Sequence, residues 1–510
     1  MKKVLSCLLV MVFLLAGCHA AVPQTEDTQI LLSDEQITVN GNGISADTTQ
    51  AVYSATDIVY YHAGQDFTYG EGGAQDEHDQ EEADAHTVVH ITKPGKYILS
   101  GKLSLGQIAV DLGEEAKEDP NAVVTLVLNN ADITCTVAPA IIFYNVYEPF
   151  SDVTEETATK DVDTTTAGAN VIIADGSTNN INGSYVAKIY KSYELSEDGK
   201  EVVDSKKLHK YDGAFYSKMT LNIDGGDNGT GILNINAENE GLDTELHLTI
   251  NGGIINIYSE NDGINTNEDN VSVTTMNGGT LNILCNGGTG EGDGIDSNGW
   301  IVINGGTLFA QACSTFGDGG IDADKGTYIN GGNVVATCNM LDQLGDGDQT
   351  YAVFNFTGSQ SKNKTYTLKD AKGNVVQEYA TDNLFLYLII AGDYLTEGDY
   401  TFWDGETQLS GVKTEQMQMH GGDAPQMPDG NNPGGMAPSV PNVEDTQIPT
   451  GNNPGGMPPV IPGEEGPKMP GGLRPPEDPI GGNGMPGGEP STTFTITKGG
   501  NQFTNVAPAN

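Results

Sequence analysis

Residues 250–257 read INGGIINI, and this stretch decides the fold because close copies of it follow at a fixed distance. The tripeptide that begins at Asn251 returns at Asn277, Asn304 and Asn330, at spacings of 26, 27 and 26 residues. Each copy is followed by a short run of alternating apolar residues, namely residues 254–257, 280–283, 307–310 and 333–336. The sequence therefore contains a structural repeat of about 26 residues.

A second alternating run comes before each tripeptide. The four runs place equivalent residues at Ile250, Met276, Ile303 and Ile329, and two residues upstream at Leu248, Thr274, Ile301 and Thr327. Period-2 alternation predicts strands with one buried face, and Gly-Gly predicts a turn because glycine accepts positive φ. Short strands at this period predict a parallel β-helix, a solenoid in which stacked coils share one core. A β-propeller blade needs four strands in about 40 residues and does not fit.

A third motif lies between the two strands of each repeat and places acids around a Leu or Ile that we expect to point inward. Equivalent side chains of neighbouring coils would stand about 4.7–4.9 Å apart, so a column of carboxylates repels itself unless water or a cation separates them. Calcium prefers such oxygen ligands, whereas the alternative is that the acids were selected for turn geometry. We expect calcium as the cofactor, with the candidate ligands Asp212, Glu240, Asp243, Asp262, Asn265, Asp293, Asp296, Asp318 and Asp322.

Composition excludes two classes of partner. The 510 residues contain 23 Lys and Arg against 70 Asp and Glu, which gives a formal net charge of −47. Nucleic-acid binding and electrostatic docking on anionic lipid both need a basic surface. We therefore expect no nucleic-acid partner.

The N-terminus has the features of a bacterial export signal. Two lysines precede an apolar run that is too short to span a bilayer, and residues 15–18 read LAGC. This ending looks like a lipobox, which implies cleavage after residue 17 and a lipid on Cys18. We expect residues 1–17 to be a lipoprotein signal peptide, residues 18–29 a tether, and the protein to be held by its lipid at the extracellular face of the cell membrane.

The repeat resembles a bacterial family of secreted, polysaccharide-lyase-like β-helix proteins that bind carbohydrate. The family's coil, D-G-I-x-[S/T] followed by G-G-T-[L/I]-x-[V/I], is matched at residues 262–266 and 278–283. The resemblance implies a right-handed parallel β-helix, bound calcium and non-catalytic binding of plant cell-wall polysaccharides such as cellulose and pectic chains. The lysine that often follows D-G-I in the family is replaced here by Asp243, Asn265, Asp296 and Asp322, which weakens the case for contact with an anionic sugar.

The remaining segments suggest further organisation. We expect an all-β chain with the β-helix carbohydrate-binding domain at residues 30–345, a small C-terminal β module at 350–412 and a terminal strand within 491–510. Residues 413–490 are rich in Pro, Gly and Met and are expected to be disordered. Residues 145–169 and 184–211 look like acidic insertions, and residues 62–90 look like a solvated His-rich loop rather than a metal-scavenging tract. The cysteines Cys135, Cys285, Cys313 and Cys338 are expected to be buried thiols, with a disulfide as the alternative.

Three functions compete on these residues. The first is a calcium-stabilised surface lipoprotein that binds polysaccharide without cleaving it, with Trp300 as a sugar contact. The second is a polysaccharide lyase acting on uronate-containing glycans, which needs a base and a cation; Lys218 and Lys325 are the only basic residues that we expect near the acids. The third is an adhesin or scaffold without a glycan ligand. The Gly-His-Gly motif of pectin hydrolases is absent.

Overall fold

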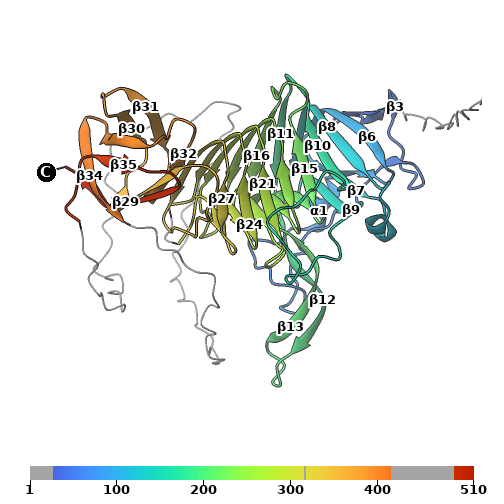
Figure 1. Ribbon diagram of the computed structural model, residues 1–510. Helices are drawn as coiled ribbons and strands as arrows, with labels where there is room; N and C mark the ends of the chain where they lie inside the picture. Colours follow the sequence, from blue (N-terminus) through green and yellow to red (C-terminus); the bar gives the residue numbers. More distant parts are fainter. Residues whose placement is uncertain (1–26, 315–316, 415–487, 510) are drawn as a thin grey trace, which may run out of the picture. The chain divides into compact units, whose positions relative to one another are not determined.

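The computed structural model describes residues 27–314, 317–414 and 488–509 (Figure 1). Over these described ranges the chain is all-β, as expected, with about half of it in strands, one short α-helix and large sheets, none of which closes on itself. Among the described residues no helix is long and apolar enough to cross a membrane. The segments for which we expect the signal peptide, the lipidated Cys18 and most of the disordered region lie outside the described residues.

Parallel pairing repeats along the middle of the chain and forms three stacks of strands. The first stack contains β10 (Ala169–Ile173), β15 (Leu221–Asp224), β18 (Leu248–Ile250), β21 (Val273–Met276), β24 (Trp300–Ile303) and β27 (Thr327–Ile329). The second stack contains β11 (Thr178–Gly183), β16 (Ile232–Ala237), β19 (Ile254–Ser259), β22 (Thr280–Cys285), β25 (Thr307–Gln311) and β28 (Asn333–Cys338).

The third stack is a separate nine-stranded sheet. It contains β4 (Val52–Ala55), β5 (Thr87–Ile91), β7 (Gly106–Asp111), β9 (Ile141–Asn145), β14 (Gly213–Ser217), β17 (Glu240–Thr244), β20 (Ile264–Thr266), β23 (Ile295–Ser297) and β26 (Asp322–Ala323). All neighbours in it are parallel except β4 and β5. Each repeat of the sequence therefore contributes one strand to each stack.

The register of the repeat is confirmed. Met276 pairs with Ile250 on one side and with Ile303 on the other, and Ile303 pairs with Ile329. These residues are buried, as are Ile255, Leu281, Leu308 and Val334 at one position of the second stack. The turn between the first two stacks is made by Gly253, Gly279, Gly306 and Gly332, all with φ between +81° and +88°.

The N-terminal strands bridge the first two stacks. The long strands β6 (Gly95–Leu103) and β8 (Val124–Cys135) pair in parallel. The first half of β8 also pairs in parallel with β10, and its second half pairs in parallel with β11. The short strands β1 (Thr28–Leu32), β2 (Thr38–Val39) and β3 (Asn42–Gly43) complete this end, with β1 pairing on β6. A 3₁₀ turn, Glu114–Glu118, lies between β7 and β8.

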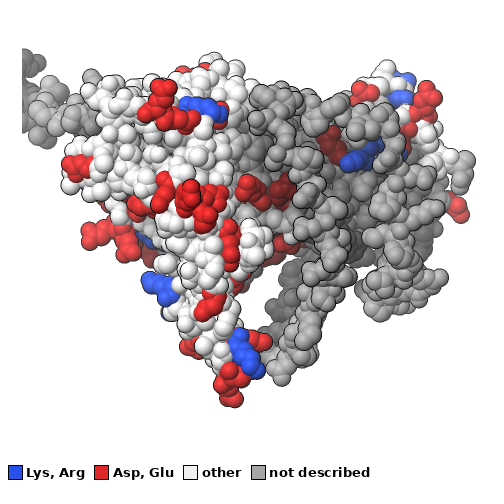
Figure 2. All heavy atoms as spheres, turned by 180° about the vertical axis from the view of Figure 1, so that it is seen from behind, with Lys and Arg blue, Asp and Glu red and all other residues white. Residues whose placement is uncertain are grey.

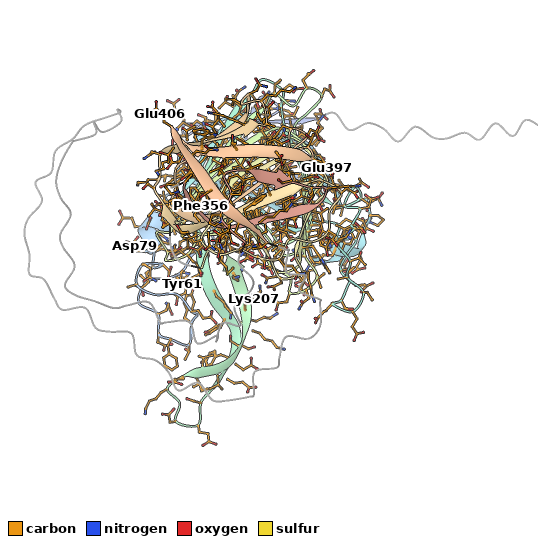
Figure 3. All side chains as sticks on the ribbon, turned by 60° about the vertical axis from the view of Figure 1, so that its left-hand side comes forward. Tyr61, Asp79, Lys207, Phe356, Glu397 and Glu406 are labelled. Carbon is orange, nitrogen blue, oxygen red and sulfur yellow. The ribbon has the colours of Figure 1, made fainter. Side chains whose placement is uncertain are left out.

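Two insertions differ in character. The expected insertion at residues 184–211 is the antiparallel hairpin of β12 (Val186–Leu195) and β13 (Val202–Tyr211), which projects from the sheets in Figures 1 and 3. The expectation of a solvated loop at residues 62–90 is wrong in part. This segment contains α1 (Gln80–Asp84), and His86 is only 1% exposed, with its ring hydrogen-bonded to the Glu82 carbonyl and to Thr136.

A second hydrophobic core lies in the C-terminal module. Its strands are β29 (Tyr351–Gln360), β30 (Lys364–Asp370), β31 (Val375–Thr381), β32 (Phe385–Ala391), β33 (Gly398–Asp404), β34 (Thr407–Thr414), β35 (Phe494–Ile496) and β36 (Gly500–Pro508). β32 pairs antiparallel with both β28 and β29, so the module continues from the last strand of the second stack. The four cysteines named above are buried thiols, as expected.

Candidate functional site

The acids of the third motif form two columns on the third stack. Asp243, Asn265, Asp296 and Asp322 pair in parallel register on β17, β20, β23 and β26. A few residues upstream, Glu240, Asp262 and Asp293 form the second column, because their chain segments hydrogen-bond in the same order. The Leu or Ile between the columns is buried in each repeat, as expected.

Two acids depart from the expected alignment by one residue. Gly213, and not Asp212, pairs with Glu240, so Asp212 precedes the column. Asp318 is also displaced, because Asp322 pairs with Asp296 while the extra Gly320 lengthens the segment between Asp318 and Asp322. The carboxylate of Asp318 accepts a hydrogen bond from the thiol of Cys313. The sequence motif thus overstates the regularity of the acids at both ends.

The column acids are held in an environment that favours their neutral forms. Glu240 is 5% exposed and Asp243 is 1% exposed. Burial, reinforced by neighbouring carboxylates, raises the pKa of Glu240 to about 8 and the pKa of Asp243 well above its ordinary value. The same causes raise the pKa of Asp262 well above its usual range, that of Asp293 to about 8, that of Asp296 to about 6 and that of Asp322 to about 7.

One cation is supplied by the chain itself. The Nζ atom of Lys210, at the end of the hairpin, lies 3.0 Å from Oδ2 of Asp212 and 3.3 Å from Oδ1 of Asn267. The expectation that Lys218 and Lys325 are the only bases near the acids is therefore wrong. Lys218 lies over the ring of Tyr144, and Lys325 lies 3.9 Å from Glu155.

Buried oxygen atoms without hydrogen-bond partners mark the centre of the columns. Asn265 donates to Oε1 of Glu240 at 3.0 Å, which leaves Oε2 of Glu240 and Oδ1 of Asn265 buried and unpartnered. Such atoms cost free energy unless water or an ion satisfies them. Among the described residues no group of three or more His, Cys, Asp or Glu side chains is arranged to hold a metal ion. A cation here would need amide, carbonyl or water oxygens beside the carboxylates.

Acidic side chains also dominate the visible surface. Figure 2 shows one face of the molecule on which Asp and Glu side chains gather in patches while Lys and Arg side chains are sparse. This distribution agrees with the formal charge of −47 and disfavours a polyanionic ligand on the bare surface.

Two grooves lie on the outer faces of the first and second stacks, and both are lined in part by polar side chains. The first has a volume of about 440 Å³ and lies beside the loop that carries Thr164, whose hydroxyl contacts Asn222 and Thr249 at 2.7 Å each. The second has a volume of about 460 Å³ and is lined by asparagines of β16, β19 and β22 together with Tyr258, Phe309 and Asp382. Trp300, expected as a sugar contact, is half-buried at the start of β24 and lines neither groove.

Residues 85–376 match the family described as "Carbohydrate-binding domain-containing protein". The chain belongs to this family. The segment includes all three stacks except β4, together with the first strands of the C-terminal module. No curated protein matches the sequence.

One solved structure is similar to this chain. Its title is "Structure of the polysaccharide lyase-like protein from C. thermocellum, Gadolinium derivative". The alignment has 21% identity and a TM-score of 0.32, and it covers 60% of this chain and 92% of that chain. The family match agrees with the carbohydrate-binding resemblance of the repeat.

Proposed function

We propose that this protein is a cell-surface lipoprotein that binds a plant cell-wall type polysaccharide without cleaving it. The observation that carries the proposal is the family match, which covers residues 85–376. The grooves support it, because both are lined in part by amide and hydroxyl groups suited to sugar hydroxyls. The lipid on Cys18 and the extracellular location belong to the proposal and rest on the LAGC ending alone.

The fold that fits this function is a right-handed parallel β-helix whose walls are the three stacks. The parallel register of consecutive repeats supports it, because each repeat passes through the stacks in the same order. Parallel crossover connections are right-handed in nearly all proteins, which supports the handedness. In such a solenoid the outer faces are flat and continuous, as a polysaccharide chain requires.

Calcium is the proposed cofactor, centred between Glu240 and Asn265. The residues fit the ion, because the two unpartnered oxygens are of the hard type that calcium prefers. Two further acids lie near these oxygens. The charge of Asp296 helps to raise the pKa of Glu240, and the charge of Glu240 helps to raise the pKa of Asp262. A divalent ion would let these carboxylates ionise, and its role would be to stabilise the fold.

Thermal unfolding of the protein with calcium and with a chelator tests the cofactor. An excess of calcium about a hundred times above Kd should stabilise the native state by about 2.7 kcal/mol. Glu240→Gln should abolish this gain, whereas Glu260→Gln, an acid outside both columns, should leave it intact. Equal melting temperatures in calcium and chelator would reject the ion and leave the acids as turn and core residues.

Pull-down on insoluble cellulose and affinity electrophoresis in polygalacturonate test the binder. Retention of the intact protein without release of product supports binding alone. Release of unsaturated products, seen as ultraviolet absorbance, would replace the binder by a lyase. No retention on any glycan would leave the surface scaffold as the remaining function.

A further inference from the structure

The groove on the second stack combines a ladder of side-chain amides with accessible aromatic rings. A ladder of asparagine amides runs across β11, β16, β19 and β22, with each Nδ2 donating to the Oδ1 of the preceding coil at 2.8–2.9 Å. The ladder consists of Asn180, Asn234, Asn256 and Asn282. At the next coil the same position holds Phe309, which pairs with Asn282.

The ladder therefore ends against an aromatic ring. Oδ1 of Asn282 has no amide donor above it, because Phe309 cannot donate a hydrogen bond. Phe309 is half-buried on the outer face of β25, where its ring is accessible from the groove. An open acceptor beside an accessible ring suits a sugar unit, which presents hydroxyl groups at its rim and C–H groups on its face.

A second ring stands in the neighbouring column. Tyr258 occupies the outward position on β19 that Asn236 holds on β16, and its side chain is 40% exposed. From the spacing of strands and of residues along them, Tyr258 and Phe309 lie about 12 Å apart. This distance exceeds one sugar ring, so the groove suits an oligosaccharide rather than a single sugar.

The C-terminal module builds one wall of this groove. The side chain of Gln311 on β25 donates to Oδ2 of Asp382 at 3.2 Å and accepts from the Asp382 amide at 2.7 Å. Asn383 next to it donates to the carbonyls of Cys285 and Ala312. These bonds fix the turn between β31 and β32 against the second stack, so this wall of the groove is held in place.

Charge selects the class of glycan. No Lys or Arg lines the groove, and its one ionisable acid is Asp382. A uronate chain would place its carboxylates beside Asp382 in a protein that already carries a formal charge of −47. A neutral chain meets no such repulsion.

We propose that this groove binds a neutral polysaccharide chain, with Tyr258 and Phe309 as stacking platforms and the asparagine ladder as hydrogen-bonding partner. The inference rests on the proposed function and specifies its binding face and ligand class. Neighbouring units of the chain would lie across β19, β22 and β25. The acid columns of the third stack then contribute to stability and not to sugar contact.

The test is binding of cellohexaose and amorphous cellulose to the full chain and its variants. Tyr258→Ala and Phe309→Ala should each weaken binding at least tenfold, and Tyr258→Phe should retain it. The matched controls are Tyr193→Ala and Phe67→Ala, which remove rings that are 44% and 49% exposed elsewhere on the molecule and should change nothing. Melting temperatures of all variants check that the fold is kept.

A footprint of the wild-type protein gives a second measurement that does not depend on a variant folding. Cellohexaose should protect Tyr258 and Phe309 from hydroxyl-radical oxidation and leave Tyr193 unprotected. If the variant that combines Tyr258→Ala with Phe309→Ala still binds cellohexaose as the wild type does, and the sugar does not protect these rings in the wild type, the groove is overturned but the proposed function stands. Binding of polygalacturonate alone would overturn the neutral ligand class, and binding of no glycan would overturn the proposed function itself.

Discussion

At the residue scale, His247 shows how burial fixes a protonation state. Its Nδ1 accepts the backbone N–H of Val273 at 3.1 Å, its Nε2 is buried without a partner, and its ring packs edge-on against Phe150. An acceptor at Nδ1 requires the neutral ring, since a protonated Nδ1 would face another donor. Burial accordingly lowers the pKa of His247 to about 4.

This arrangement predicts a loss of stability in acid. The folded pKa of about 4 lies below the ordinary 6.5, so the unfolded chain binds more protons between these values and stability falls as pH falls through them. The full effect is roughly 3 kcal/mol. Urea unfolding at pH 7, 5.5 and 4.5 measures it against His247→Asn, which keeps an acceptor near Nδ1 but does not titrate. Identical pH slopes for the two proteins would contradict the prediction.

A second residue-scale prediction concerns Glu148, which is 3% exposed. Its Oε2 accepts the Thr220 amide at 2.6 Å and its Oε1 accepts the Thr220 hydroxyl at 3.0 Å. Glu148→Gln replaces one acceptor by a donor and leaves a buried N–H without a partner. We expect it to lower the free energy of unfolding by about 1–3 kcal/mol. Thr220→Ser, which keeps both donors, is the control and should cost less in the same urea titration.

Some residues of the candidate site could be predicted from the sequence, and others could not. The columns of Asp243, Asn265, Asp296 and Asp322 follow from the repeat, because register in a stack is set by the hydrophobic pattern. The position of Lys210 does not, because it depends on how the hairpin returns to the stack. Tyr258 and Phe309 do leave a signal in the sequence, because both occupy outward strand positions that hold Asn in the preceding repeat.

At the element scale, the turn between the first and second stacks depends on glycine for two separable reasons. Gly306 has φ +86°, and a Cβ there would lie 2.7 Å from the Gly279 carbonyl oxygen. Gly373, between β30 and β31, has φ +82° with nothing within 4 Å of a Cβ. The first glycine meets both backbone strain and a close neighbouring coil, whereas the second meets strain alone.

Alanine at the two positions should therefore have unequal effects. Gly373→Ala should cost about 1 kcal/mol through its positive φ, and Gly306→Ala should cost about 3 kcal/mol or more because the coil must also move. Chemical denaturation of both variants gives the comparison. A cost at Gly306 no larger than at Gly373 would show that the stacked turn yields freely.

For the elements outside the repeat, the sequence predicts the strands but not how they pack against the rest of the chain. The expected C-terminal β module at residues 350–412 contains strands β29 to β33 and most of β34, which local alternation of apolar residues indicates. Their docking is not a local property: Gln311 and Asp382 are 71 residues apart in sequence and meet only in the folded chain. The same holds for His86, whose burial depends on Thr136.

At the scale of the whole molecule, β32 couples two hydrophobic cores. Ile389 packs in the core of the stacks, while Leu388 and Ile390 on its other face pack in the core of the C-terminal module. The sequence predicts both regions but not this shared strand, since alternation shows that two faces exist without showing what covers each. Because one strand belongs to both cores, we expect the full chain to unfold cooperatively.

The two tryptophans allow this coupling to be measured. Trp300 lies on β24 in the first stack, and Trp403 lies on β33 in the module, where its ring is 4.2 Å from the ammonium of Lys369. Trp300→Phe and Trp403→Phe leave one reporter each. In the full chain both reporters should give the same urea midpoint, as a single cooperative transition requires.

Removing residues 488–510 should separate the two transitions. This change deletes β35 and β36, and with them the fully buried Phe494 and Phe503 that pack around Phe354. Burial of each such ring contributes about 1.5–3 kcal/mol to the free energy of unfolding. The module therefore loses this contribution in addition to the backbone pairing of β35 and β36. The Trp403 midpoint should therefore fall well below the Trp300 midpoint, which should move little because the core of the stacks is intact. A common midpoint in the truncated chain would mean that β32 transmits the loss through the whole molecule, and the stacks would then depend on the module for their stability.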